Sequence, residues 1–295
     1  MSISTAPQTP QPSPRPALWP LVALTGLLVW AYFPMLRVFF DKWLNDPQYS
    51  HGFLVPFFSA YLLKRAFSEG PAAFRAMPVI GCAMLLVVFA MRALAGSLLF
   101  HQLDAASFLL ALMAVSVAAG GFALLKKTAP AILFLVFMIP LPYELERNVG
   151  QPLKNAATVS STFLLQTLGQ PAIRDGNLIL IDEVKLGVVD ACSGLKMMVT
   201  FAAFAVGAVL LMKRSKFEKM MVILGIIPIA IIANVMRITA TGLGYIWLTD
   251  AKTLDFLHDL HGWLMMPAGL ALLGVEVWVL RKLVIDTPAR SPMPA

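Results

Sequence analysis

The stretch Val188-Val189-Asp190-Ala191-Cys192-Ser193-Gly194-Leu195-Lys196 joins two kinds of sequence. Aliphatic and β-branched residues before it, over 177–189, favour strands, and the apolar run 197–212 after it is typical of a membrane helix. Cys192 therefore lies at a predicted helix start, where free backbone N–H groups and the helix dipole stabilise an anion. A thiol in this position loses its proton more easily and becomes a nucleophile. The alternative is that Cys192 is a small buried packing residue.

The composition indicates a membrane protein. Of 295 residues, 59% are hydrophobic and only 13% are charged, against roughly 25% charged residues in soluble globular proteins. The two cysteines are too few for a disulfide framework, and Cys82, inside an apolar run, is interpreted as a packing residue. The net charge of +7 does not indicate nucleic-acid binding, because the basic residues gather in short loops between apolar runs.

Apolar runs of about 17–25 residues are long enough to cross a bilayer. We predict an all-α polytopic membrane protein with about eight transmembrane helices, over residues 18–40, 52–64, 77–99, 105–125, 129–143, 191–212, 219–247 and 261–281. The second and fifth runs are short, and the alternatives for them are re-entrant or tilted segments. They form one integral-membrane domain, residues 18–285, between a disordered N-terminus (1–17) and a short tail (286–295). With the N-terminus inside, the cytoplasmic loops carry 13 of the 23 basic residues but only four of the 16 acidic ones, so both termini are predicted to be cytoplasmic.

The longest segment on the opposite side, residues 144–190, is an insertion large enough to fold by itself. Its first part, 147–168, has apolar residues at helical spacing and is predicted to be an amphipathic helix at the membrane surface. Its second part, 172–189, holds the turn Asp175-Gly176-Asn177 and two aliphatic stretches. We predict a β-hairpin there that leads to Cys192.

Charged residues inside apolar runs are the next candidates for a site. A guanidinium costs about 2.5–3.5 kcal/mol on membrane-insertion scales, so it usually faces a partner or a wet cavity. Arg237 lies in the outer half of the predicted seventh span, with Asn234 one turn earlier on the same face. Arg92, in the third span, is a weaker candidate for the same role. The alternative for Arg237 is a structural arginine paired with Asp190 or a backbone carbonyl.

Two histidines open the predicted last span, in His258-Asp259-Leu260-His261-Gly262-Trp263. Histidine is the natural base for a thiol near neutral pH. His258 and His261, three residues apart, share one helical face, so they are also candidates for a metal pair completed by His51 or Asp259. A further alternative is a pair of histidines at the membrane interface, without chemistry.

The predicted topology brings Cys192, Arg237 and His258 toward the same outer surface, although they belong to three different spans. A thiolate, an imidazole base and a guanidinium that stabilises an oxyanion are together sufficient for acyl transfer.

At these residues the chain resembles the exosortase/archaeosortase family of integral-membrane cysteine transpeptidases. The most specific segments are Ala191-Cys192-Ser193-Gly194-Leu195-Lys196, Asn234-Val235-Met236-Arg237, and His258 before Gly262-Trp263. Three more stretches are similar to the family: Tyr49-Ser50-His51-Gly52, Pro140-Leu141-Pro142 and Arg174-Asp175-Gly176-Asn177.

The resemblance implies roles for residues. Cys192 would be the nucleophile, His258 the general base and acid, and Arg237 the stabiliser of the oxyanion or substrate carbonyl. Ser193, Asn234, His51 and His261 are the predicted substrate-binding residues, and the nearness of His261 leaves open which histidine is the base. No cofactor or metal is expected.

The resemblance also implies the partners: secreted proteins that end in a Pro-Glu-Pro-type motif, a transmembrane helix and a basic tail. Cleavage would occur on the periplasmic side of a bacterial inner membrane, among membrane lipids, and in connection with exopolysaccharide production. A transporter or scaffold for polysaccharide export is the first alternative, because transport pathways also use intramembrane residues such as Arg92 and Arg237. Metal-dependent hydrolysis at His258 and His261 is the second.

Overall fold

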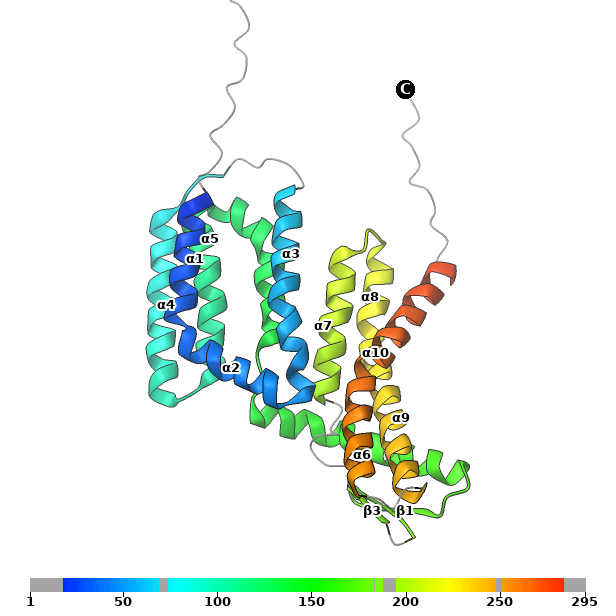
Figure 1. The fold of residues 1–295 in the computed structure, drawn as a ribbon. Helices are drawn as coiled ribbons and strands as arrows, with labels where there is room; N and C mark the ends of the chain where they lie inside the picture. Colours follow the sequence, from blue (N-terminus) through cyan, green and yellow to red (C-terminus); the bar gives the residue numbers. More distant parts are fainter. Residues whose placement is uncertain (1–17, 69–73, 183, 188–194, 248–250, 284–295) are drawn as a thin grey trace, which may run out of the picture. The chain divides into compact units, whose positions relative to one another are not determined.

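The computed structural model describes residues 18–68, 74–182, 184–187, 195–247 and 251–283 (Figure 1). Helices make up most of these residues, as the composition predicts. The predicted terminal segments, 1–17 and 286–295, lie outside the described residues.

Contacts divide the chain into two compact units. Unit 1 comprises Met1–Arg37 and Ser59–Leu133, and unit 2 comprises Val38–Phe58 and Phe134–Ala295.

The described part of unit 1 consists of helices and short connections between them. It contains α1 (Leu18–Ala31), the first residues of α2 (Phe33–Asn45), most of α3 (Leu54–Ser68), α4 (Pro78–Leu98) and α5 (His101–Phe134). α1 and α2 are bent by 73° around Tyr32, so the predicted span 18–40 is broken. Pro34, just after the bend, lacks the N–H that would continue the helical hydrogen bonds.

α5 reverses direction at Gly121, whose backbone (φ 67°, ψ −165°) suits glycine far better than any other residue. The Thr128 hydroxyl donates to Ser116 Oγ at 3.1 Å, although a straight helix would hold residues twelve positions apart at about 18 Å. The reversal falls inside the predicted run 105–125, and the predicted run 129–143 covers the end of α5, η2 and the chain up to the start of α6. Gly81 of α4 packs so closely on the backbone of Ala118 that a Cβ there has no room.

Unit 2 is built around α9. It holds two 3₁₀ segments, η1 (Pro47–Phe53) and η2 (Leu135–Met138), and the helices α6 (Tyr143–Thr167), α7 (Leu195–Leu211), α8 (Lys216–Leu224), α9 (Ile226–Trp247) and α10 (Ala251–Leu283). α9 packs on α6, α7 and α10, and α6 runs across the lower end of these helices (Figure 1). The predicted span 219–247 is divided at Gly225, where Glu276 of α10 leaves no room for a Cβ.

The insertion contains a helix followed by a sheet, but the sheet is larger than predicted. Strands β1 (Ala172–Asp175), β2 (Leu178–Ile181) and β3 (Val184–Gly187) form an antiparallel sheet in the order β1-β2-β3. The sequence analysis predicted one hairpin from the two aliphatic stretches after the turn Asp175-Gly176-Asn177, and the structure adds β1 before this turn, with one buried and three exposed residues. Ile179 and Ile181 of β2 are fully buried in a cluster with Leu165 of α6 and Ile238 of α9.

The predicted count of eight membrane spans is not confirmed for the described residues. Three helical stretches there are long and apolar enough to cross a membrane: Pro78–Leu98 (α4), His101–Met138 (α5 continued by η2) and Lys216–Ile246 (α8 continued by α9). The bent pair α1 and α2 adds a fourth if it is one span. α7 is apolar but shorter. The helices therefore support a membrane protein and leave its orientation a prediction.

Candidate functional site

The predicted site residues fall into two groups. Arg237 and Asn234 on α9 and His51 in η1 are described with their side chains. His258 and His261 belong to α10, but their side chains lie outside the description, and Cys192 and Ser193 lie outside the described residues altogether. The geometry of the site is therefore built from the helices that carry these residues.

Arg237 and Asn234 are set deep into unit 2. Arg237 is 4% exposed and Asn234 is 1% exposed, and their spacing of three residues puts them on one side of α9. They lie between two apolar clusters: Ala230 and Ala233 of α9 belong to the cluster with α7, α8 and α10, and Ile238 belongs to the cluster with α6 and the sheet. Burying a guanidinium is expensive unless it has polar partners, so the fold must maintain this position for a reason other than hydrophobic packing.

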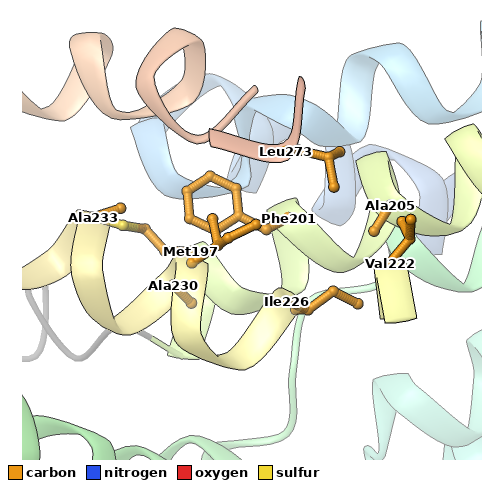
Figure 2. Close-up of a cluster of buried hydrophobic side chains, with 9 residues drawn as sticks. Met197, Phe201, Ala205, Val222, Ile226, Ala230, Ala233 and Leu273 are labelled. Carbon is orange, nitrogen blue, oxygen red and sulfur yellow. The ribbon is translucent and has the colours of Figure 1, made fainter. Parts of the chain in front are cut away.

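α7 and α9 run side by side in opposite directions. Figure 2 shows Met197, near the start of α7, beside Ala230 and Ala233 of α9, while Ala205 lies toward Val222 and Ile226 at the other end of the cluster. Arg237 is four residues beyond Ala233, about 6 Å further along the helix axis. Arg237 thus lies beyond the level of Met197, toward the end at which α7 begins at Leu195; Cys192, three residues earlier in the sequence, lies outside the described residues.

α10 runs in the same direction as α7 and carries the histidines toward the same end. Phe201 of α7 occupies the space that a Cβ on Gly269 would need, and Leu273 shares the cluster with Ala205. From Gly269, His261 is eight residues and His258 eleven residues toward the start of α10, about 12 and 16 Å along the axis. Leu195 is six residues, about 9 Å, before Phe201, so His261 and His258 lie about 3 and 7 Å past the start of α7 along the axis, and the register does not decide between them.

His51 occupies a closed environment. Its side chain is 2% exposed; Nε2 lies 3.2 Å from the carbonyl oxygen of Phe137 and Nδ1 lies 2.9 Å from Thr200 Oγ1 of α7. Because a carbonyl can only accept, Nε2 carries the proton, and in the neutral ring Nδ1 accepts from the threonine hydroxyl. Both ring nitrogens of His51 therefore have protein partners in the structure, and substrate binding by His51 stays a prediction.

Two aromatic neighbours of His51 bond to the same irregular backbone. The indole N–H of Trp43 donates to the carbonyl of Met138 at 3.1 Å. The hydroxyl of Tyr49 accepts from the Leu141 N–H at 3.2 Å and donates to Glu146 Oε1 at 2.5 Å. Burial, and then the hydrogen bond to Glu146, raises the pKa of Tyr49 far above its ordinary value, so the phenol stays protonated.

Sequence reasoning missed the polar side of α6. Lys154, Thr158, Ser161 and Thr162 are all buried, and the Ser161 hydroxyl donates to the backbone carbonyl of Val235 at 3.4 Å. These residues lie on the side of α6 that packs against α9. Their spacing was visible in the sequence, but only the apolar residues of this segment were used to predict a helix.

Arg92 belongs to unit 1 and has a different environment. Its guanidinium donates to the carbonyl of Ala31, lies 4.0 Å over the ring of Tyr32, and has Nε 3.7 Å from Asp104 Oδ1. These contacts explain Arg92 as the residue that supports the bend between α1 and α2. Cys82 is exposed on α4 rather than packed. In the described part of the chain, no three His, Cys, Asp or Glu side chains gather as metal ligands.

Comparison with known proteins gives one result. A protein-family model described as transmembrane exosortase (Exosortase_EpsH) matches residues 43–275, which include every predicted site residue. No curated protein matches the chain. No solved structure matches it either.

Proposed function

Because the chain belongs to the transmembrane exosortase family, we propose that it is a membrane-embedded cysteine protease and transpeptidase that removes C-terminal sorting tails from secreted proteins. Cys192 is the nucleophile, His258 the general base and acid, and Arg237 the group that stabilises the oxyanion. The observation that carries the proposal is the buried pair Arg237 and Asn234, toward the end at which α7 begins.

The chemistry follows from these residue types. The Cys192 thiolate attacks the carbonyl carbon of the scissile peptide, and the negative charge that forms on the oxygen is stabilised by Arg237. When the C–N bond breaks, the protonated imidazole of His258 gives its proton to the leaving amine, and an acyl-thioester remains on Cys192. His258 then removes a proton from the incoming acceptor as the acceptor attacks the thioester, which regenerates the thiolate. Asn234, Ser193 and His261 are proposed to bind the peptide around the reacting carbonyl.

The proposed substrates are secreted proteins with a Pro-Glu-Pro-type motif, a transmembrane helix and a basic tail. We propose that such a helix reaches the enzyme through the lipid and presents its motif at one membrane surface. This surface would be the one near the starts of α7 and α10 and the end of α9, the helix ends that bear the proposed catalytic residues. We place the reaction at the periplasmic face of a bacterial inner membrane, in support of exopolysaccharide production.

The direct test is tail removal from a co-expressed substrate that carries this tripartite C-terminus. Cys192→Ala should abolish the size change of the substrate, while Cys82→Ala, in the exposed position on α4, should leave it intact. Both variants must be present in the membrane in equal amounts. Tail removal by Cys192→Ala at the wild-type rate would refute a thiol nucleophile.

A further inference from the structure

We propose that His51 is a positioning residue for the reaction, because it fixes the first turns of α7 through Thr200 and thereby sets the place of Cys192. This inference rests on the proposed function. The elements involved are η1, the chain between η2 and α6, and α7, all of which belong to unit 2.

The chain between η2 and α6 needs support from outside itself. If the helix continued, the Phe137 carbonyl would accept from residue 140 in a 3₁₀ turn, and the Met138 carbonyl would accept from residue 142 in an α turn. Both positions are prolines, which have no backbone N–H to donate. A backbone group without a partner costs several kcal/mol where water is excluded, as in a membrane protein.

Side chains of one short segment meet this need. His51 donates to the Phe137 carbonyl, Trp43 donates to the Met138 carbonyl, and Tyr49 accepts from the Leu141 N–H. We call Trp43, Tyr49 and His51, together with the backbone of residues 137–141, the aromatic clamp. Gly52 is part of its fit, because the Trp43 indole fills the place of a Cβ there. The two family-like stretches around Tyr49 and Pro140, almost a hundred residues apart in sequence, thus form a single structural feature.

A buried hydrogen bond links the aromatic clamp to α7. Thr200 is 3% exposed, and its hydroxyl meets His51 Nδ1 at 2.9 Å. Thr200 lies five residues after Leu195, where α7 begins, and eight residues after Cys192. The apolar contacts of Met197 and Phe201 have no preferred direction, whereas a buried hydrogen bond has one and so adds a fixed orientation to the packing of α7. A nucleophile misplaced by about 1 Å can lose roughly a hundredfold in rate.

Matched variants separate the two bonds of His51. In His51→Asn, the side-chain oxygen can still accept from Thr200 while the bond to Phe137 is lost; in His51→Gln, the side-chain nitrogen can still donate to Phe137 while the bond to Thr200 is lost. The proposal expects His51→Asn to retain more activity than His51→Gln. Thr200→Val should lower kcat for tail removal by about ten- to a hundredfold with little change in KM, and Thr200→Ser should restore it.

A second readout does not depend on turnover. In a Cys82→Ala background, the rate of Cys192 alkylation by a maleimide reports the environment of the thiol, and Thr200→Val should change this rate while Thr200→Ser does not.

If His51→Gln and Thr200→Val keep wild-type kcat and alkylation rates while Cys192→Ala is inactive, the positioning role is refuted and the proposed function stands. If Thr200→Val lowers only the amount of folded protein, with kcat per folded molecule unchanged, His51 is structural alone and the proposal is also refuted. If Cys192→Ala itself is active, the proposed function fails, and this outcome is distinct from both others.

Discussion

One arginine in each unit, Arg92 of α4 and Arg237 of α9, interrupts an apolar helix, and the two differ in what surrounds them. Arg92 of unit 1 has a side chain that is 35% exposed and lies against a carboxylate, a carbonyl and an aromatic ring. Arg237 of unit 2 is 4% exposed and lies between two apolar clusters, with Asn234 on the same side of α9. The first arrangement neutralises a charge and supports a bend in the chain. The second buries a guanidinium, together with Asn234, among the packed helices of unit 2, and a buried intramembrane arginine commonly marks a functional site.

The largest expected difference between the two arginines is in catalysis. Arg237→Gln removes the charge that stabilises the oxyanion, so tail removal should fall by about 10²–10³-fold, whereas Arg92→Gln should leave turnover per folded molecule near the wild-type value. Turnover is measured on equal amounts of folded protein in proteoliposomes. Equal losses in the two variants would mean that Arg237 is no more catalytic than Arg92.

Close-packed glycines allow the same comparison for helix contacts. Gly81 in unit 1 and Gly269 in unit 2 have no room for a Cβ, against Ala118 and Phe201 respectively, while Gly274 faces open space. An alanine at either crowded position should destabilise the fold by about 1–3 kcal/mol, and Gly274→Ala should not destabilise it, because alanine favours a helix more than glycine does. Because Gly269 sets the register of α10 against α7, Gly269→Ala should also lower turnover per folded molecule, and Gly81→Ala should not.

The alignment of α10 with α7 would be irrelevant to the reaction if Gly269→Ala kept full turnover despite a lower melting temperature. Alkylation of Cys192 in the same variant gives an independent check, since the thiol should respond to a displaced histidine-bearing helix.

The role assigned to Arg92 predicts a smaller effect, on stability. Arg92→Met removes the partner of the Ala31 carbonyl and leaves Asp104 without its cation, which should lower stability by about 1–2 kcal/mol. Adding Asp104→Asn should recover part of this loss, because an uncompensated carboxylate is costly in a region of low polarity. Thermal unfolding of the single and double variants measures both effects. A double variant less stable than Arg92→Met would contradict the pairing.

The sequence predicts those parts of the fold that depend on local patterns. The apolar run 77–99 corresponds to α4 (Pro78–Leu98), and the periodic segment 147–168 corresponds to most of α6 (Tyr143–Thr167). Breaks inside apolar runs were missed, because their cause is distant in the sequence. The bend at Tyr32 is supported by Arg92, and the division at Gly225 is matched by the close approach of Glu276.

The candidate site shows the same limit. Arg237 and Asn234 could be selected from the sequence because polar residues within apolar runs are rare. The environment of His51 could not, because its partners Phe137 and Thr200 are 86 and 149 residues away. A histidine beside a family-like segment suggests substrate binding, and only the structure reveals that its two nitrogens join other parts of the protein.

The smallest expected difference concerns two buried tyrosines, one in each unit. Tyr32 bonds to the Ser107 hydroxyl and Tyr49 bonds to the Glu146 carboxylate. Burial and the Glu146 carboxylate raise the pKa of Tyr49, and η1 lies outside the candidate spans. The folded state therefore holds this proton more tightly than the unfolded chain, in which a tyrosine has a pKa of about 10. The stability that depends on this proton is complete below pH 10 and is lost as the pH rises toward the folded-state pKa.

At pH 10.3 this single group should already lower the free energy of unfolding by about 0.6 kcal/mol relative to neutral pH, because about two thirds of the unfolded chains have lost the Tyr49 proton. Melting temperatures of the wild type and Tyr49→Phe, measured between pH 8 and 10.5, should therefore converge as the pH rises, since the variant lacks the group that titrates. Parallel curves would mean that the phenol of Tyr49 ionises as easily in the folded protein as in the unfolded chain. That result would contradict the closed environment on which the aromatic clamp depends. It would also remove the difference between Tyr49, which bonds to a carboxylate, and Tyr32, which bonds to a hydroxyl.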